Sequence, residues 1–206
     1  MLKKEHEILQ EFIGSPWKKF TFKDTKKMSG KKSDSYIYAI LKKFVAQGIL
    51  TEEKAGNVVL YSLNLASLKT QAYSGFTAEY LAWKKKHIPF PDLERIASKI
   101  PTPFYSFIIT GSYARGIQKN DSDLDLVIIC DDCLEPKKIY AELKHDCEMN
   151  IPQIHLYIFK KTEFLTMLLD KKANYGKEVI KQNLILFGGE IYYNLLGEAI
   201  QNGFNG

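Results

Sequence analysis

The segment from Phe104 to Ile129 constrains the fold and the function more than any other part of the chain. An apolar run, Phe104 to Thr110, passes directly into Gly111-Ser-Tyr-Ala-Arg-Gly116, and Ser122-Asp-Leu-Asp125 opens a second apolar run. Short apolar runs that are rich in β-branched residues and bounded by turn residues predict buried strands. We therefore expect two strands of one sheet, with their polar residues confined to the turns.

The turn after the first run has the composition of a phosphate site. A glycine at position 111 lets the backbone approach a phosphate closely, and a helix that begins near Tyr113 directs unpaired N–H groups at that anion. Ser112 adds a hydroxyl donor, and Arg115 is placed to reach the same oxygens, although it could equally be a solvated surface arginine. We assign Gly111, Ser112, Arg115 and also Ser122 as nucleotide-binding residues.

Asp123 and Asp125 open the second strand and lie on one face of it, because alternate residues of a strand share a face. Two neighbouring carboxylates repel each other unless a cation lies between them, and magnesium prefers such oxygen ligands together with substrate phosphates. An isolated Asp-x-Asp is often only a solvent-facing pair. Downstream of a Gly-Ser turn, however, the pair predicts magnesium ligands.

The Gly-Ser turn, followed by Asp-x-Asp on a strand, resembles the signature of the DNA polymerase beta-like nucleotidyltransferase superfamily. The resemblance implies Mg²⁺-dependent transfer of a nucleoside monophosphate from a nucleoside triphosphate, here expected to be ATP, to a hydroxyl acceptor. It also implies that Asp123 and Asp125 are catalytic residues. Pyrophosphate would leave, and two metals would hold the attacking and leaving oxygens.

The sequence departs from this family at the third carboxylate, which members bring from a neighbouring strand. The next predicted strand is Gln153 to Phe159, and its alternation leaves Gln153 and His155 facing the site. Neither is a carboxylate, and histidine is a poor magnesium ligand. His155 could act as a general base or simply pack, and the placement of Glu148, before Pro152, stays open. Besides an enzyme, the pattern therefore allows a non-catalytic nucleotide-binding regulator or an antitoxin-like partner protein.

The first third of the chain predicts a separate domain. Helices are expected near residues 5–13, 23–28 and 34–46, and two strands near residues 49–63 form a hairpin. Three helices followed by a hairpin resemble the winged helix-turn-helix fold. The resemblance implies that the third helix enters the major groove of DNA, although winged helices also dock proteins.

Charge is concentrated in this first third. Residues 1–65 contain 12 lysines and no arginine against 7 acidic residues, whereas residues 66–206 contain 17 residues of each sign. Segregated positive charge favours a polyanionic partner, so we expect contact with DNA or RNA through residues 1–64. A solvated lysine-rich surface would have the same composition.

The domain organisation follows from these patterns. We expect an α/β (α+β) protein with a winged helix domain at 1–64, a connecting helix or linker at 65–90, and a nucleotidyltransferase domain at 91–206 with a small mixed sheet covered by helices. Apolar residues recur at helical spacing in the connecting helix and predict its packed face: Leu65, Leu68, Ala72, Phe76, Tyr80 and Trp83. Near the C-terminus, helical lysines 177 and 181 either approach the triphosphate or are solvated.

The cysteines and the N-terminal segment bear on two other classes, zinc-binding proteins and membrane proteins. Cys130 and Cys133 form a C-x-x-C, which with Cys147 and His145 could hold zinc, although three ordinary thiols are the simpler interpretation. The N-terminus is charged and no run approaches the length of a membrane span, so we expect a cytoplasmic protein without a membrane partner.

Overall fold

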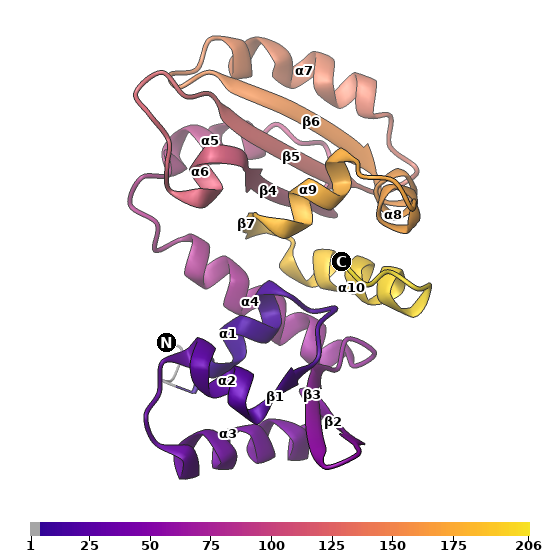
Figure 1. Ribbon diagram of the computed structural model, residues 1–206. Coiled ribbons are helices and arrows are strands. Elements are labelled where there is room, and N and C mark those ends of the chain that lie inside the picture. Colours follow the sequence, from indigo (N-terminus) through magenta and orange to yellow (C-terminus); the bar gives the residue numbers. More distant parts are fainter. Residues whose placement is uncertain (1–4) are drawn as a thin grey trace.

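The computed structural model describes residues 5–206, and its elements form two sheets with helices between and around them (Figure 1). The first sheet belongs to the N-terminal part and is antiparallel, with strand order β1-β3-β2. The elements of this part, in chain order, are α1 (His6–Gly14), β1 (Phe20–Thr21), α2 (Phe22–Ser29), α3 (Asp34–Ala46), β2 (Leu50–Ala55) and β3 (Val58–Leu63). The three predicted helices and the predicted hairpin are thus present. Lys3 and Lys4 lie outside the described residues.

Side-chain caps fix the starts of two of these helices. Thr21 and Asp24 form a reciprocal capping box at the start of α2, and the Ser33 hydroxyl accepts a hydrogen bond from the backbone N–H of Tyr36 at the start of α3. Such caps satisfy backbone donors that a helix leaves unpaired. The apolar side chains of α3 then lie on one buried face, as their spacing predicts: Ile37, Ile40, Leu41 and Phe44.

The second sheet is mixed, with strand order β6-β5-β4-β7, and only β5 and β6 run parallel. Its strands are β4 (Tyr105–Thr110), β5 (Leu124–Cys130), β6 (Ile154–Lys160) and β7 (Leu184–Phe187). The helices of this part of the chain are α5 (Phe90–Ala97), α6 (Gly111–Arg115), α7 (Pro136–Glu148), α8 (Lys161–Leu169), α9 (Tyr175–Lys181) and α10 (Gly189–Gln201). The expected small mixed sheet with helical cover is confirmed.

Helices cover the two faces of this sheet in two groups. Leu124, Leu126 and Ile128 of β5 share a buried cluster with residues of α5 and α7. Val127 and Ile129 belong to a second cluster, together with residues of α8, α9 and α10. Because side chains of β5 alternate between these clusters, Asp123 and Asp125 lie on the side of the sheet that α8, α9 and α10 cover.

The predicted packed face of the connecting helix was wrong. Of the predicted residues, Leu65 precedes helix α4 (Leu68–Ala82) and is buried. Leu68, Ala72 and Phe76 of the helix and Trp83 after it are exposed. Its buried residues are mostly small or polar: Thr70, Gln71, Ser74, Gly75, Thr77 and Ala82. The reason is a close approach to the start of α10, where a Cβ atom added at Gly75 would lie 2.5 Å from the carbonyl carbon of Gly189. Large side chains cannot lie between two backbones at that separation.

The hydrophobic core crosses the expected boundary between the N-terminal part and the rest of the chain. One buried cluster contains Ile8 and Phe12 of α1 as well as Leu195 of α10. The Tyr193 hydroxyl donates a buried hydrogen bond of 3.1 Å to the carbonyl of Ile13. Helix α10 therefore packs against both parts, as its central position in Figure 1 illustrates. No helix within residues 5–206 has both the length and the apolar character needed to cross a membrane.

Candidate active site

The turn between β4 and α6 requires glycine for two reasons. Gly111 has a positive φ of 69°, a conformation that residues with a side chain rarely adopt. A Cβ atom added there would also lie 2.1 Å from Oδ2 of Asp125. The glycine predicted from sequence and the second aspartate of the motif are therefore in direct contact, and the carboxylate occupies the space that any larger residue would need.

Asp123 and Asp125 are held by the register of three strands. Asp125 pairs with Thr110 of β4 on one side and with His155 of β6 on the other, and its side chain is 29% exposed. Asp123 immediately precedes β5 and is more exposed. Burial raises the pKa of Asp125 above its ordinary value, His155 opposes that shift, and the neighbouring charge of Asp123 adds to it.

His155 faces the site, as the alternation of β6 predicts. Its Nε2 lies 3.3 Å from Oδ2 of Asp123, and its Nδ1 lies 3.7 Å from Oδ1 of Asp125. The imidazole thus contacts both carboxylates from the strand that in the resembling family carries a third acid. Glu148, whose placement the sequence leaves open, ends α7 and lies 3.6 Å from the amine of Lys144.

The protein ligands available to a divalent ion are two carboxylates. Within residues 5–206 no group of three or more His, Cys, Asp and Glu side chains has the arrangement of a self-sufficient metal site. Asp123 and Asp125, on one face of the sheet, match the one or two carboxylates through which magnesium is usually bound together with substrate phosphates. The residues present therefore fit one magnesium ion that shares its coordination with a phosphate ligand.

A cavity of about 380 Å³ adjoins Asp125, whereas Asp123 does not line it. It is lined by Thr110, Gly111, Arg115, Asp125, Tyr175, Glu178, Lys181 and Gln182. Gly111, Asp125 and Arg115 were predicted as site residues. Lys181 is one of two lysines for which the sequence left open whether they approach a triphosphate or are solvated. The other, Lys177, donates a hydrogen bond to the carbonyl of Asp170 instead.

Ser112 and Ser122 do not line this cavity. Ser112 is half-buried on α6, and its carbonyl accepts the backbone N–H of Ile117. The Ser122 hydroxyl accepts a hydrogen bond of 2.8 Å from the backbone N–H of Lys119, which closes the loop before β5. Their roles in nucleotide binding stay predictions.

Sequence analysis missed Tyr175 and Glu178 of α9. The Tyr175 hydroxyl is buried and finds no hydrogen-bond partner within residues 5–206, and burial raises the pKa of this phenol. Its ring packs 4.6 Å, between centroids, from that of Tyr157 on β6. The sequence predicts a helix at these residues. It does not indicate that this helix packs back over the carboxylates.

Within residues 5–206 no cysteine lines the cavity beside Asp125. Cys130 ends β5 and Cys147 lies in α7, both buried, whereas Cys133 is exposed. Burial raises the pKa of the Cys130 thiol, and it raises that of Cys147 to about 11. Both buried thiols are therefore protonated at neutral pH.

Comparison with known proteins concerns the part of the chain that carries this site. A search among curated proteins found no match. A solved structure described as a toxin–antitoxin with AMP-PNP is 14% identical, with a TM-score of 0.40, over 56% of this chain and 88% of that chain. Residues 93–187 match the family model of the nucleotidyltransferase domain, a range that contains Gly111, both aspartates and the cavity. Residues 93–187 are therefore similar to nucleotidyltransferase domains.

Proposed function

We propose that this protein is a magnesium-dependent nucleotidyltransferase that uses a nucleoside triphosphate, with ATP as the expected donor. One observation carries the proposal. Asp125, the second acid of the Asp-x-Asp pair, lies against Gly111 of the phosphate turn, so a metal bound by the aspartates would lie beside phosphates held at that turn.

The reaction transfers a nucleoside monophosphate to a hydroxyl. The acceptor oxygen attacks the α-phosphorus and forms a new P–O bond, while the bond from the α-phosphorus to the bridging oxygen of the β-phosphate breaks. Pyrophosphate leaves with the electron pair of that bond, and the proton of the hydroxyl passes to solvent. Magnesium, when bound, would neutralise triphosphate charge and polarise the transferred phosphoryl group.

The chain contributes binding and orientation. Asp123 and Asp125 would hold the ion, and the backbone of Gly111 would approach the phosphates. Arg115 and Lys181 line the same cavity and supply positive charge for the triphosphate tail. The unpartnered Tyr175 hydroxyl offers a further donor to a phosphate oxygen, since a buried hydroxyl without a partner is costly unless a ligand satisfies it.

His155 supports a second candidate function, a nucleotide-binding regulator or antitoxin-like partner without turnover. The imidazole contacts both aspartates from the strand where the resembling family has a carboxylate. Two carboxylates can hold the ion that is bound together with the nucleotide. A second ion, which would activate the acceptor, lacks the ligand that a third carboxylate would supply. Replacement of His155 by Asp should then raise transfer, and an unchanged or lower rate would count against this view.

We also propose that residues 1–64 form a winged helix-turn-helix domain that contacts DNA or RNA. Its observed helices and hairpin have the required order, and its net charge is positive. Half of its described lysines are already in ion pairs: Lys19–Glu53, Lys26–Asp34, Lys31–Glu7, Lys42–Glu52 and Lys43–Glu5. A protein partner for the same surface is therefore the main competitor of nucleic acid.

Binding of the intact protein to a labelled short DNA or RNA duplex at low and moderate salt tests the nucleic-acid role. Replacement of Lys27 and Lys32 by Glu should weaken binding and flatten its salt dependence, because phosphate neutralisation releases counterions. The adjacent surface lysines 137 and 138 of α7 provide a matched charge-reversal control. Equal binding by both double variants would reject the proposed nucleic-acid surface.

The transferase proposal is tested by incubating the intact protein with α-labelled ATP, Mg²⁺ and cell extract. Label transferred to an acceptor and pyrophosphate released are both measured. Asp123→Asn should abolish transfer, whereas Asp131→Asn, in the exposed segment after β5, should retain it. Label transfer by Asp123→Asn at the wild-type rate would refute the assignment of this site. ATP binding without transfer in any mixture would favour the regulator.

A further inference from the structure

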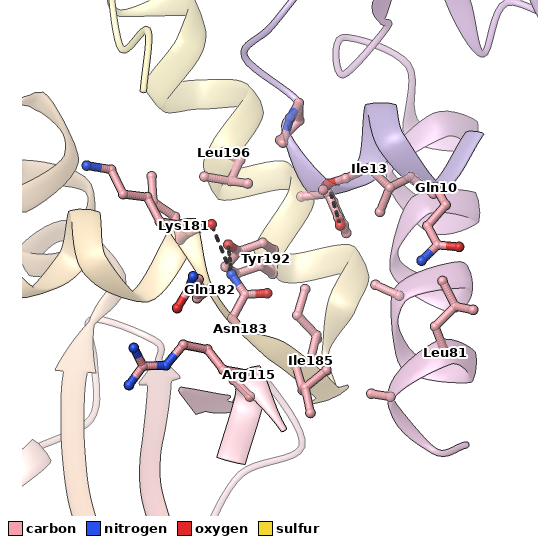
Figure 2. Close-up of a pocket in the computed structure, with 18 of the residues that line it drawn as sticks. Gln10, Ile13, Leu81, Arg115, Lys181, Gln182, Asn183, Ile185, Tyr192 and Leu196 are labelled. Carbon is pink, nitrogen blue, oxygen red and sulfur yellow. Dashed lines mark hydrogen bonds between the residues drawn. The ribbon is translucent and has the colours of Figure 1, made fainter. Parts of the chain in front are cut away.

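A larger cavity of about 780 Å³ lies between the N-terminal part and the nucleotidyltransferase domain (Figure 2). Its walls come from α1 and α4 on one side and from α6, β7 and α10 on the other. This volume lies within the range of pockets that hold small organic ligands, which is about 300–1,000 Å³. The cavity therefore depends on the junction between the two parts of this chain.

The charged residues that line this cavity are all cationic. They are Lys84 and Lys85 after α4, Arg115 of α6 and Lys181 of α9, and no aspartate or glutamate lines it. None of the four forms an ion pair with another residue between positions 5 and 206. The Lys84 amine lies over the ring of Tyr80, 4.1 Å from its centroid. Four unpaired cations around one cavity favour an anionic ligand.

The remaining walls suit a planar organic group. Ile13, Leu81 and Ile185 are apolar, and Trp17 adds an indole ring. Most polar lining groups already bond within the protein, such as the amide of Asn183, which donates to the Tyr192 hydroxyl at 3.0 Å. The ligand should thus combine an apolar or aromatic body with a negative end.

Two amide side chains supply hydrogen-bonding capacity in this cavity. Gln10 of α1 and Gln182, between α9 and β7, line it, and neither side-chain amide bonds to another residue between positions 5 and 206. Primary amides present both donors and acceptors. These groups match the heteroatoms on the edge of a nucleobase.

The interdomain cavity shares part of its lining with the candidate active site. Arg115, Lys181 and Gln182 line both cavities. In Figure 2 the charged ends of Arg115 and Lys181 extend to the same side, away from Gln10 and Leu81. Lys84 and Lys85 follow Leu81 at the end of α4. A ligand whose anionic end contacts these two lysines would therefore direct its other end toward Arg115 and Lys181, which adjoin Asp125.

We propose that this interdomain cavity binds a nucleoside phosphate as the acceptor of the transfer, distinct from the triphosphate donor. The phosphate would contact Lys84 and Lys85, and the base would lie against the apolar wall. The sugar hydroxyls would then face the lining shared with the active site, where one of them can attack the α-phosphorus of the donor. The acceptor role rests on the proposed function. The nucleoside phosphate has two possible sources, a free nucleotide and the terminal nucleotide of a strand.

The experiment separates acceptor binding from catalysis. Binding of adenosine 5′-monophosphate and of an adenosine hexaribonucleotide is measured by calorimetry with intact Asp123→Asn protein in EDTA, where donor binding through magnesium cannot contribute. Binding of the mononucleotide alone identifies a free nucleotide, and tighter binding of the hexanucleotide identifies a strand end. The double variant Lys84→Glu/Lys85→Glu should weaken either interaction by about tenfold or more, because two charged contacts are reversed.

The matched control is Lys137→Glu/Lys138→Glu, which makes the same charge change at an adjacent lysine pair on α7, away from the cavity. It should bind like the parent protein. Failure of both probes to bind, or equal weakening by both double variants, would overturn the proposal. Binding that persists when no label transfer is detected would support the cavity while refuting the transferase function. If transfer depends on Asp123 but Lys84→Glu/Lys85→Glu leaves it unchanged, the transferase function would be supported and the cavity proposal would be refuted.

Discussion

Strand β5 and helix α4 both pass through the middle of the molecule, yet they bury opposite kinds of side chain. β5 buries large apolar residues on both faces, including Leu126 and Val127, which are fully buried. α4 buries Ser74, Gly75 and Thr77 and exposes its large residues, so that Leu68 is 72% exposed and Phe76 is 49% exposed. Position in the fold therefore does not by itself decide which residues are buried.

The difference comes from the distance to the neighbouring backbone. β5 lies between two helix layers, and side chains fill the space between them. α4 instead meets the start of α10 backbone to backbone, and the Glu79 carboxylate accepts a hydrogen bond of 2.7 Å from the N–H of Gly189. Burial raises the pKa of Glu79, and this hydrogen bond opposes the shift. A contact of this kind selects small and hydrogen-bonding residues, which leaves the aromatic ones outside.

Replacement of a β5 core residue should have the largest effect on stability. Leu126→Ala removes a fully buried side chain between β5 and the helices α5 and α7. The lost burial and the cavity left behind should lower the free energy of unfolding by about 2–5 kcal/mol. Urea denaturation measures the change, and a loss below that of Gly75→Ala would reverse the order of the two regions.

The Gly111→Ala variant tests the close contact between the phosphate turn and Asp125, just as Gly75→Ala tests the contact between α4 and α10. The new methyl group would overlap the Asp125 carboxylate and meet an unfavourable φ. We expect Mg²⁺-dependent nucleotide binding to fall by roughly 100-fold, the size of loss expected when a positioned phosphate or metal contact is removed. Gly116→Ala, also at positive φ but with only the His87 ring within 4 Å of the added Cβ atom, is the control for backbone strain. Similar losses in both variants would assign the effect to strain rather than to the carboxylate contact.

Gly75→Ala tests the close approach of α4 and α10 directly. Alanine favours the helix, but its methyl group would lie 2.4 Å from the backbone nitrogen of Glu190. The helices must separate, and we expect a loss of about 1–3 kcal/mol, typical of overpacking. Thermal unfolding against Gly14→Ala, where an added methyl group meets no atom within 4 Å, provides the measurement and its control. An unchanged or raised midpoint would show that this contact tolerates a side chain.

Replacement of an exposed aromatic residue of α4 should have the smallest effect. Phe76 is half exposed and stacks on Tyr80 at 6.1 Å between ring centroids. Phe76→Ser should change the free energy of unfolding by less than about 1 kcal/mol, since surface substitutions away from core contacts are small. The matched internal change is Phe164→Ser, which alters a fully buried ring. Comparable losses in chemical denaturation would mean that the outer face of α4 is buried in solution.

Local signals account for what the sequence predicted. Apolar spacing within residues 34–46 located α3, and the period of β6 placed His155 beside the aspartates. Long-range contacts account for what it missed. The inward face of α4 is set by Gly189, more than a hundred residues later in the chain. Tyr175 enters the site only because α9 returns to the sheet, a path that no local pattern specifies.

The shared core has a consequence for folding during synthesis. Ile8 and Phe12, which emerge early from the ribosome, are buried in the same cluster as Leu195 of α10. Contacts between residues so far apart in sequence form late and slow the folding reaction. Until α10 is synthesised, the N-terminal helices expose apolar surface, so a chain stalled before residue 189 should recruit chaperones and be sensitive to proteases.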